Sequence, residues 1–286
     1  MSHCSPSKAV KSNNTCMTYK ELKMIADDYN QTISDTQKKI KICRSKEKLH
    51  ENIRQALQSH CNEESCWIEQ DFLSGHKKRI LEESFRPKTP RAWYKNKRTW
   101  LNTYDILNVM RQYENLYKDF YFLGVFPIDF TSFYPSSGTC IGDAACTIEI
   151  TQLLEKKKKR FGIVLNLDNH TQSGSHWVSV YCGFDPKKPN FGIYYYDSVA
   201  YPPSKEIKDF FTKIKEQVSR HYGDNAAAAF EVRYNTVQKQ FKNTECGVFS
   251  IVFQTQMLKD IEFDTICKQM RKDDRINEIR DIIYRP

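Results

Sequence analysis

The chain has 286 residues, of which 40% are hydrophobic and 13% aromatic, and its formal net charge is +9. This length can bury a sizeable core, and the apolar content excludes an intrinsically disordered chain. No window approaches the ~18 consecutive apolar residues of a membrane-spanning helix, and the first residues lack the apolar segment of a secretory signal. We therefore expect a globular protein with no membrane span and no signal peptide.

The positive charge admits an anionic partner. The densest basic run extends from Lys156 to Arg160. Its simplest interpretation is a solvated segment that precedes a buried strand, while contact with nucleic acid through a basic surface stays open.

The ten cysteines are too sparse for a disulfide scaffold, so we expect reduced thiols in a cytosol or nucleus. Cys61 and Cys66 lie near His60 and His76, but their spacing fits no common pattern of zinc ligands. We predict no metal site.

Residues 1–90 are polar and are predicted to form a helical N-terminal arm domain with a partly disordered start. Tyr19, Leu22 and Ile25 recur at helical spacing. The segment that contains Pro87 and Pro90 is typical of an extended linker. Residues 91–286 are predicted to form the second domain.

The second domain alternates helical and strand patterns. A helix is expected after a cap at Asn102 or Thr103, and an amphipathic helix after the prolines at 202–203. Short β-branched or aromatic runs predict strands at 161–167, 176–182, 191–197 and 230–235, and a mostly apolar helix begins at 246. This order predicts an α+β fold in which a small mixed sheet packs on a central helix.

Cys246 lies at the expected start of that central helix. The unpaired N–H groups of a first helical turn and the helix dipole favour a thiolate, which is the effective nucleophile. Gly247 leaves room for another backbone or a substrate to approach. The alternative is that Cys246 is one more small buried side chain.

His176 begins one expected strand and Asp197 ends the next. If 176–182 and 191–197 pair as an antiparallel hairpin, these two residues lie opposite each other. A carboxylate on one imidazole nitrogen then fixes the tautomer, and the other nitrogen can accept the thiol proton. Alternatively, His176 caps a sheet edge and Asp197 only ends a strand.

Gln240 precedes Cys246 by six residues. Its side-chain amide could donate to a developing oxyanion beside the backbone N–H of Cys246. Taken alone, a glutamine in a polar run carries little information.

The pairs His-Trp at 176–177 and Tyr-Asp at 196–197, with Gln-x5-Cys-Gly at 240–247, resemble the ubiquitin-like-protein-specific cysteine proteases. This family includes the SUMO proteases and the adenovirus maturation protease. The runs ESCW at 64–67 and FPIDF at 126–130 are similar to the branch that processes polyproteins in large DNA viruses such as African swine fever virus. That branch carries a helical N-terminal arm.

The resemblance implies that Cys246 is the nucleophile, His176 the general base and acid, Asp197 the orienting carboxylate and Gln240 the oxyanion donor. Asp197 departs from the asparagine associated with the swine-fever branch. Trp177 and Gly247 become candidate substrate-binding residues.

The implied activity is cleavage after Gly-Gly-type motifs, without metal or cofactor, to mature viral structural polyproteins in host cytoplasm or virion. Three alternatives stay open. The first is a protease that deconjugates SUMO or a related modifier, and the second is an acetyltransferase that reuses the same groups. The third is a non-enzymatic basic protein that binds nucleic acid.

Overall fold

The computed structural model describes residues 3–9, 15–59, 61–73 and 75–286. The chain divides into two compact units, one of Met1–Thr89 with Ile283–Pro286 and the other of Pro90–Ile282. Residues 283–286, which the sequence analysis assigned to the second domain, group with the first unit. Residues 283–286 group there because they bond to residues of the first unit. The Thr89 N–H donates to the Arg285 carbonyl, and the Arg285 guanidinium pairs with Glu69.

The first unit is helical. Its helices are α1 (Pro6–Ala9), α2 (Tyr19–Thr32), α3 (Lys46–Leu57), α4 (Glu64–Glu69) and α5 (Lys77–Ser84), with a 3-10 turn at Thr36–Lys38. Helix α2 begins with a capping box between Thr18 and Glu21, and it buries Leu22 and Ile25 as its spacing predicted. The sequence predicts a partly disordered start for this unit. Residues 1–2 and 10–14, which belong to that start, lie outside the described ranges.

Six of the ten cysteines form disulfides, which corrects the expectation of reduced thiols. The pairs are Cys4–Cys16, Cys61–Cys66 and Cys140–Cys146. The fold brings the Cα atoms of each pair within 5.0 to 6.1 Å, inside the range that a disulfide bridges. Spacing along the chain could not reveal this proximity. The free thiols are those of Cys43, Cys182, Cys246 and Cys267.

The second unit contains a five-stranded mixed sheet in the order β1-β2-β3-β4-β5. The strands are β1 (Phe120–Pro127), β2 (Arg160–Asn166), β3 (Trp177–Gly183), β4 (Gly192–Tyr196) and β5 (Glu231–Tyr234). The outer pairs, β1 with β2 and β4 with β5, are parallel, and the two inner pairs are antiparallel. Strand β1 was not among the predicted strands.

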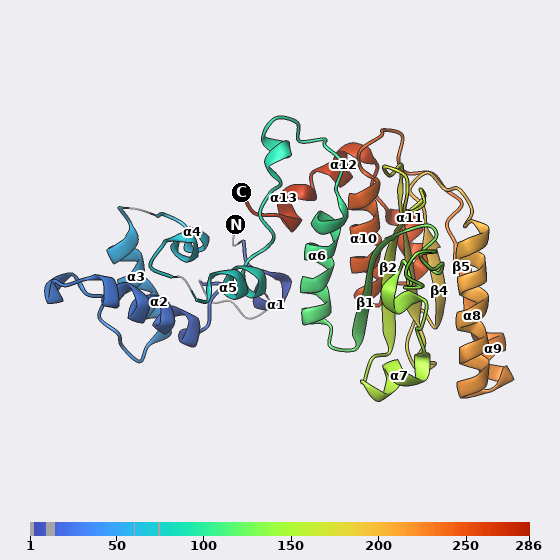
Figure 1. Ribbon diagram of the computed structural model, residues 1–286, viewed down its shortest axis with the longest axis horizontal. Coiled ribbons are helices and arrows are strands. Elements are labelled where there is room, and N and C mark those ends of the chain that lie inside the picture. The colour runs from blue at the N-terminus through green and yellow to red at the C-terminus, as the bar shows by residue number, and fades with distance from the viewer. Residues whose placement is uncertain (1–2, 10–14, 60, 74) are drawn as a thin grey trace. The chain divides into compact units, whose positions relative to one another are not determined.

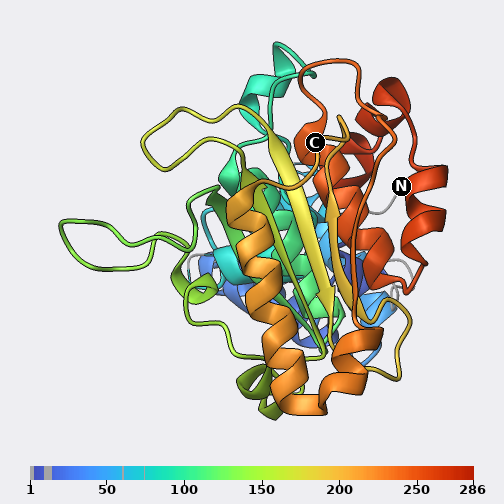
Figure 2. The ribbon, with the colours of Figure 1, turned by 90° about the vertical axis from the view of Figure 1, so that its right-hand side faces the viewer.

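Helices cover both faces of this sheet. From residue 90 onward the helices are α6 (Thr103–Leu116), α7 (Ile150–Glu155), α8 (Lys205–Tyr222), α9 (Asp224–Ala229), α10 (Cys246–Leu258), α11 (Phe263–Gln269), α12 (Asp273–Asn277) and α13 (Arg280–Ile283), with 3-10 turns at Arg91–Tyr94 and Asp143–Ala145. Figure 1 shows α6 and α10 on one side of the strands and α8 on the other. Figure 2 shows α8 running along its face of the sheet.

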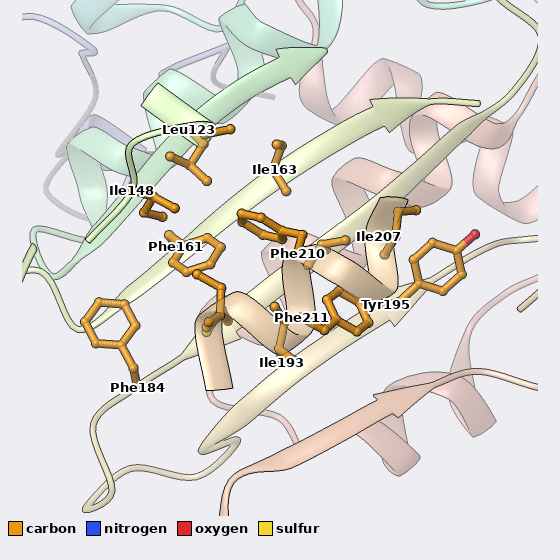
Figure 3. Packing of buried hydrophobic residues seen from close by; sticks show 14 of the residues in the cluster. Leu123, Ile148, Phe161, Ile163, Phe184, Ile193, Tyr195, Ile207, Phe210 and Phe211 are labelled. Carbon is orange, nitrogen blue, oxygen red and sulfur yellow. The ribbon is translucent and has the colours of Figure 1, made fainter. Parts of the chain in front are cut away.

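The face beneath α8 holds an aromatic and aliphatic core. Phe210 and Phe211 of α8 lie among Phe161 and Ile163 of β2 and Ile193 of β4 (Figure 3). Successive side chains of a strand point to opposite faces, so the alternate residues of β2 face α10 instead. Both faces are therefore buried, which explains why β2, β3 and β4 read as nearly continuous apolar runs.

Helix α10 is the central helix that the sequence predicted. Twelve of its thirteen residues are buried, and it packs against β3 and α6. A helix that is apolar on all sides is stable only inside a core. The expected α+β fold, with a small mixed sheet packed on a central helix, is confirmed. No helix in the described part of the chain is long and apolar enough to cross a membrane.

We predict that Phe210→Ala lowers the free energy of unfolding by about 3–5 kcal/mol, because it leaves a cavity beneath α8. The Phe210 ring packs edge-on against Phe130, with ring centres 5.2 Å apart, and is 2% exposed. Urea unfolding measures the change. Tyr104→Ala on α6 is the control, because Tyr104 is 72% exposed and its loss should cost under about 0.5 kcal/mol. Equal effects of the two substitutions would contradict the assignment of the core.

Candidate active site

The candidate site lies at one end of the sheet. His176 immediately precedes β3, Asp197 immediately follows β4, and Cys246 is the first residue of α10. Because β3 and β4 are antiparallel, the start of one strand and the end of the other lie at the same end of the sheet. The fold therefore gathers residues that are far apart in the chain.

The imidazole of His176 is held by a buried carboxylate. Its Nε2 lies 2.7 Å from Oδ1 of Asp197, a residue with no exposed surface. The expected register was wrong, however. Ser179 lies opposite Tyr196 rather than opposite Tyr194, so the strands are offset by two residues. His176 and Asp197 are therefore diagonal neighbours rather than directly opposite. Because side chains alternate with a period of two, an offset of two residues leaves both on the same face of the sheet, where they bond to each other.

Hydrogen bonds hold both the backbone N–H and the backbone carbonyl of Asp197. The side chain of Asn235 accepts from the Asp197 N–H at 2.8 Å and donates to the Asp197 carbonyl at 2.7 Å. The Val199 N–H donates to Oδ1 of Asp197, the same oxygen that bonds His176. These contacts orient the carboxylate before any substrate binds.

Cys246 lies near enough to His176 to interact electrostatically with its ring. Burial favours the neutral ring, but hydrogen bonds to the Asp197 carboxylate and to Cys246 outweigh it and raise the pKa of His176 to about 9. The arrangement therefore favours the protonated His176 ring at neutral pH.

Cys246 occupies the first turn of α10, with Glu245 as the N-cap residue. The first N–H groups of a helix have no acceptor within it, so they can bind developing negative charge. The space beside Gly247 is filled by this chain, since an added Cβ would lie 3.0 Å from Cβ of Leu101. Gly247 thus allows the close approach of Leu101.

Gln240 is buried and fixed at both ends of its amide. Its Oε1 accepts from the Ser198 hydroxyl at 2.6 Å, and its Nε2 donates to the Lys242 carbonyl at 2.6 Å. An amide nitrogen carries two hydrogens, so the bond to Lys242 leaves one N–H for another acceptor.

Trp177 follows His176 and forms part of the wall of a cavity of about 470 Å³. Trp100, Tyr134 and Phe126 also line this cavity, together with the more polar His170. The Trp177 indole donates to the Leu101 carbonyl at 2.9 Å and is 7% exposed, so its ring is held in place.

Asn235 and Ser198 support the site, although the sequence analysis did not single them out. A lone asparagine after a strand and a serine after an aspartate are too common to attract notice. Their roles can be recognised only in the folded chain, where Asn235 bonds the backbone of Asp197 and Ser198 bonds Gln240.

Metal ligands do not gather anywhere in the described part of the chain. Among those residues no three histidine, cysteine or acidic side chains cluster as metal ligands would. Cys61 and Cys66 are bonded to each other, so they cannot supply thiolates to a metal.

A thiol near an imidazole that is held by a carboxylate is the arrangement of a cysteine hydrolase. Comparison with known proteins narrows this class. Residues 155–282 match the Ulp1 protease family, C-terminal catalytic domain.

Two viral relatives resemble the chain over most of its length. A thiol protease of Acanthamoeba polyphaga mimivirus is 28% identical over all of this chain and 94% of its own. A cysteine protease of African swine fever virus is 23% identical over 79% of this chain and 83% of its own. A crystal structure of the African swine fever virus protease matches with a TM-score of 0.71 at 16% identity, covering 99% of this chain and 96% of that one.

The chain is a cysteine protease, and its residues 155–282 are similar to the catalytic domain of the Ulp1 family. The family resemblance inferred from the sequence is thereby confirmed.

We predict that Asp197→Asn lowers the pKa of the His176 ring, because it removes the negative charge that stabilises the imidazolium. A pH titration of the histidine ring resonances by NMR measures the shift from about 9 toward the ordinary value. Asp129→Asn is the matched control, since Asp129 pairs with the Nδ1 of His170 instead. A His176 pKa that is the same in wild type and Asp197→Asn would contradict the electrostatic account.

Proposed function

We propose that the protein is a cysteine endopeptidase that cleaves after Gly-Gly-type motifs through a Cys246–His176–Asp197 triad. The observation that carries the proposal is the bond of His176 to the buried Asp197, with Cys246, the first residue of α10, near enough to influence the same ring.

In the proposed mechanism, the Cys246 thiolate attacks the carbonyl carbon of the scissile peptide bond. The oxyanion accepts N–H bonds from the Cys246 backbone and the Gln240 amide. The His176 imidazolium gives its proton to the leaving amine as the C–N bond breaks, which leaves a thioester. Water then attacks the thioester, His176 accepts the water proton, and the thiolate departs.

The shape of the cavity beside Trp177 supports a preference for small residues before the cleaved bond. Trp100, Trp177 and Tyr134 give it bulky walls, and Trp177 is fixed by its bond to Leu101. We expect a substrate strand that passes these rings to be accepted more readily with glycine than with a branched side chain.

The proposed substrates are the structural polyproteins of a large DNA virus, cleaved in host cytoplasm or virion. This choice is supported by relatives from mimivirus and African swine fever virus. Deconjugation of a SUMO-like modifier is the second candidate, because one swine-fever relative is named a SUMO-1 cysteine protease. A folded modifier fusion tested against a viral polyprotein distinguishes the two. We further propose that residues 1–90 form an arm domain of the protease, whose core lies within residues 91–286.

We predict that Cys246→Ala abolishes hydrolysis of a Gly-Gly peptide while the unfolding temperature stays close to that of wild type. Cys246→Ser should be nearly inactive, because a hydroxyl is far less acidic than a thiol. Asp197→Asn should keep partial activity, because an amide can still orient the ring.

A vinyl-sulfone probe with a Gly-Gly sequence, followed by peptide mapping, provides the direct assay. Modification should fall on Cys246 rather than on Cys182 or Cys267, because burial raises the pKa of Cys267 to about 12 and that of Cys182 well above its ordinary value. Undiminished hydrolysis by Cys246→Ala, together with salt-sensitive binding to nucleic acid, would favour the binding protein instead. Turnover of acetyl-CoA would favour the acetyltransferase.

We predict that peptides with glycine before the scissile bond are cleaved fastest, those with alanine more slowly, and those with valine scarcely at all. The physical reason is exclusion of side chains by the aromatic walls. Values of kcat/KM for the three peptides measure the preference, and equal values would exclude a narrow passage.

A further inference from the structure

The loop that precedes Cys246 is fastened by side chains from the C-terminal end of the second unit. Residues 240–245 connect the proposed oxyanion donor Gln240 to the N-cap of α10 and lie outside any helix or strand. This stretch will be called the oxyanion loop. Its conformation sets where the amide of Gln240 and the backbone N–H of Cys246 lie relative to each other.

Asp273 holds the first half of the oxyanion loop. This aspartate is the first residue of α12, is 6% exposed, and accepts the Phe241 N–H at 3.1 Å and 2.9 Å on its two carboxylate oxygens. A hydrogen bond to an ionised acceptor is stronger than one between neutral groups. The adjacent Asp274 pairs with the ammonium of Lys242, which adds a second contact at the surface.

Arg280 holds the second half of the oxyanion loop. It has no exposed surface, and its guanidinium lies 4.5 Å from the centre of the Trp93 ring. One of its nitrogens donates to the Thr244 carbonyl at 2.8 Å, two residues before Cys246. A second nitrogen donates to the Thr99 carbonyl at 2.8 Å.

The second contact of Arg280 reaches the other side of the site. Thr99 lies two residues before Leu101, whose side chain packs against Gly247 and whose carbonyl accepts the Trp177 indole. One planar guanidinium thus joins the oxyanion loop to the segment that supports the Trp177 wall. A lysine could not reproduce this fork, because its ammonium is a point charge on a flexible stem.

We propose that Arg280 and Asp273 are positioning residues that hold the oxyanion loop in its catalytic conformation. The inference rests on the proposed function. Oxyanion stabilisation depends on donors that are in place before the reaction, and a displacement of about 1 Å can cost about 100-fold in rate. Arg280 and Asp273 therefore act on the transition state through Gln240 and the Cys246 N–H, without touching substrate.

The test compares three measurements on the purified full-length chain. The first is hydrolysis of a Gly-Gly peptide, and the second is inhibition by a Gly-Gly peptide aldehyde, whose hemithioacetal carries an oxygen in the oxyanion position. The third is alkylation of Cys246 by iodoacetamide, a displacement that forms no oxyanion and reports only the thiolate–imidazolium pair.

For Arg280→Gln we expect kcat to fall about 10- to 100-fold with KM nearly unchanged, and the aldehyde inhibition constant to rise by a similar factor. Alkylation of Cys246 should stay within about twofold of wild type, because His176 and Asp197 are untouched. Arg275→Gln is the matched control, since Arg275 is exposed on α12 and pairs with Glu278.

Asp273→Ala should show the same pattern, and Asp273→Asn should recover part of the activity because it keeps one acceptor oxygen. Asp281→Asn is the control, an exposed aspartate that pairs with Lys97. If Arg280→Gln does not fold, Asp273→Ala and Asp273→Asn still test whether contacts to the oxyanion loop support catalysis.

Combining Arg280→Gln with Gln240→Ala should cost little more than Gln240→Ala alone, because both changes remove the same stabilisation. Aldehyde affinity that stays at the wild-type value in both Arg280→Gln and Asp273→Ala would overturn the inference. Wild-type protein that neither hydrolyses Gly-Gly peptides nor reacts at Cys246 would instead overturn the proposed function.

Discussion

The antiparallel pairing of β3 with β4 is the interaction on which the candidate site depends. It brings His176, just before one strand, and Asp197, just after the other, to the same end of the sheet, where α10 begins. Strand pairing is strongly specified here, because both faces of these strands are buried and a slip of one residue would turn every side chain to the wrong face. The apolar core beneath α8 and the buried helix α10 therefore fix the site by fixing the register.

The site buries the side chain of Asp197, and hydrogen bonds to its carboxylate offset part of the cost of removing it from water. Asp197 is fully buried, and its Oδ1 bonds both the His176 ring and the Val199 N–H, while Asn235 fixes its backbone. Burial alone would favour a neutral imidazole, but its two partners reverse that preference and raise the pKa of His176. Low solvation strengthens these attractions as much as it penalises an unpaired charge.

The two halves of the site have different kinds of support. His176 and Asp197 are attached to a rigid sheet, whereas Gln240 and the approach to Cys246 belong to a loop. The loop is anchored at Ser198 on one side, and on the other by Asp273 and Arg280. Long-range side-chain contacts thus give an irregular segment the fixed geometry that a strand would otherwise supply.

The sequence by itself determined the α+β class, the central helix and the choice of Cys246, His176, Asp197 and Gln240 as candidates. Hydrophobic periodicity indicates the class and the helix, because it acts over a few residues, and the choice of the four candidates also rests on the resemblance of the motifs at 176–177, 196–197 and 240–247 to a known family. Only the tertiary structure decided the offset of β3 against β4, the pairing of six cysteines, the addition of β1 and the contacts of Asn235, Asp273 and Arg280. Each of these depends on residues far apart in the chain meeting in space, and no local pattern records which of them will meet.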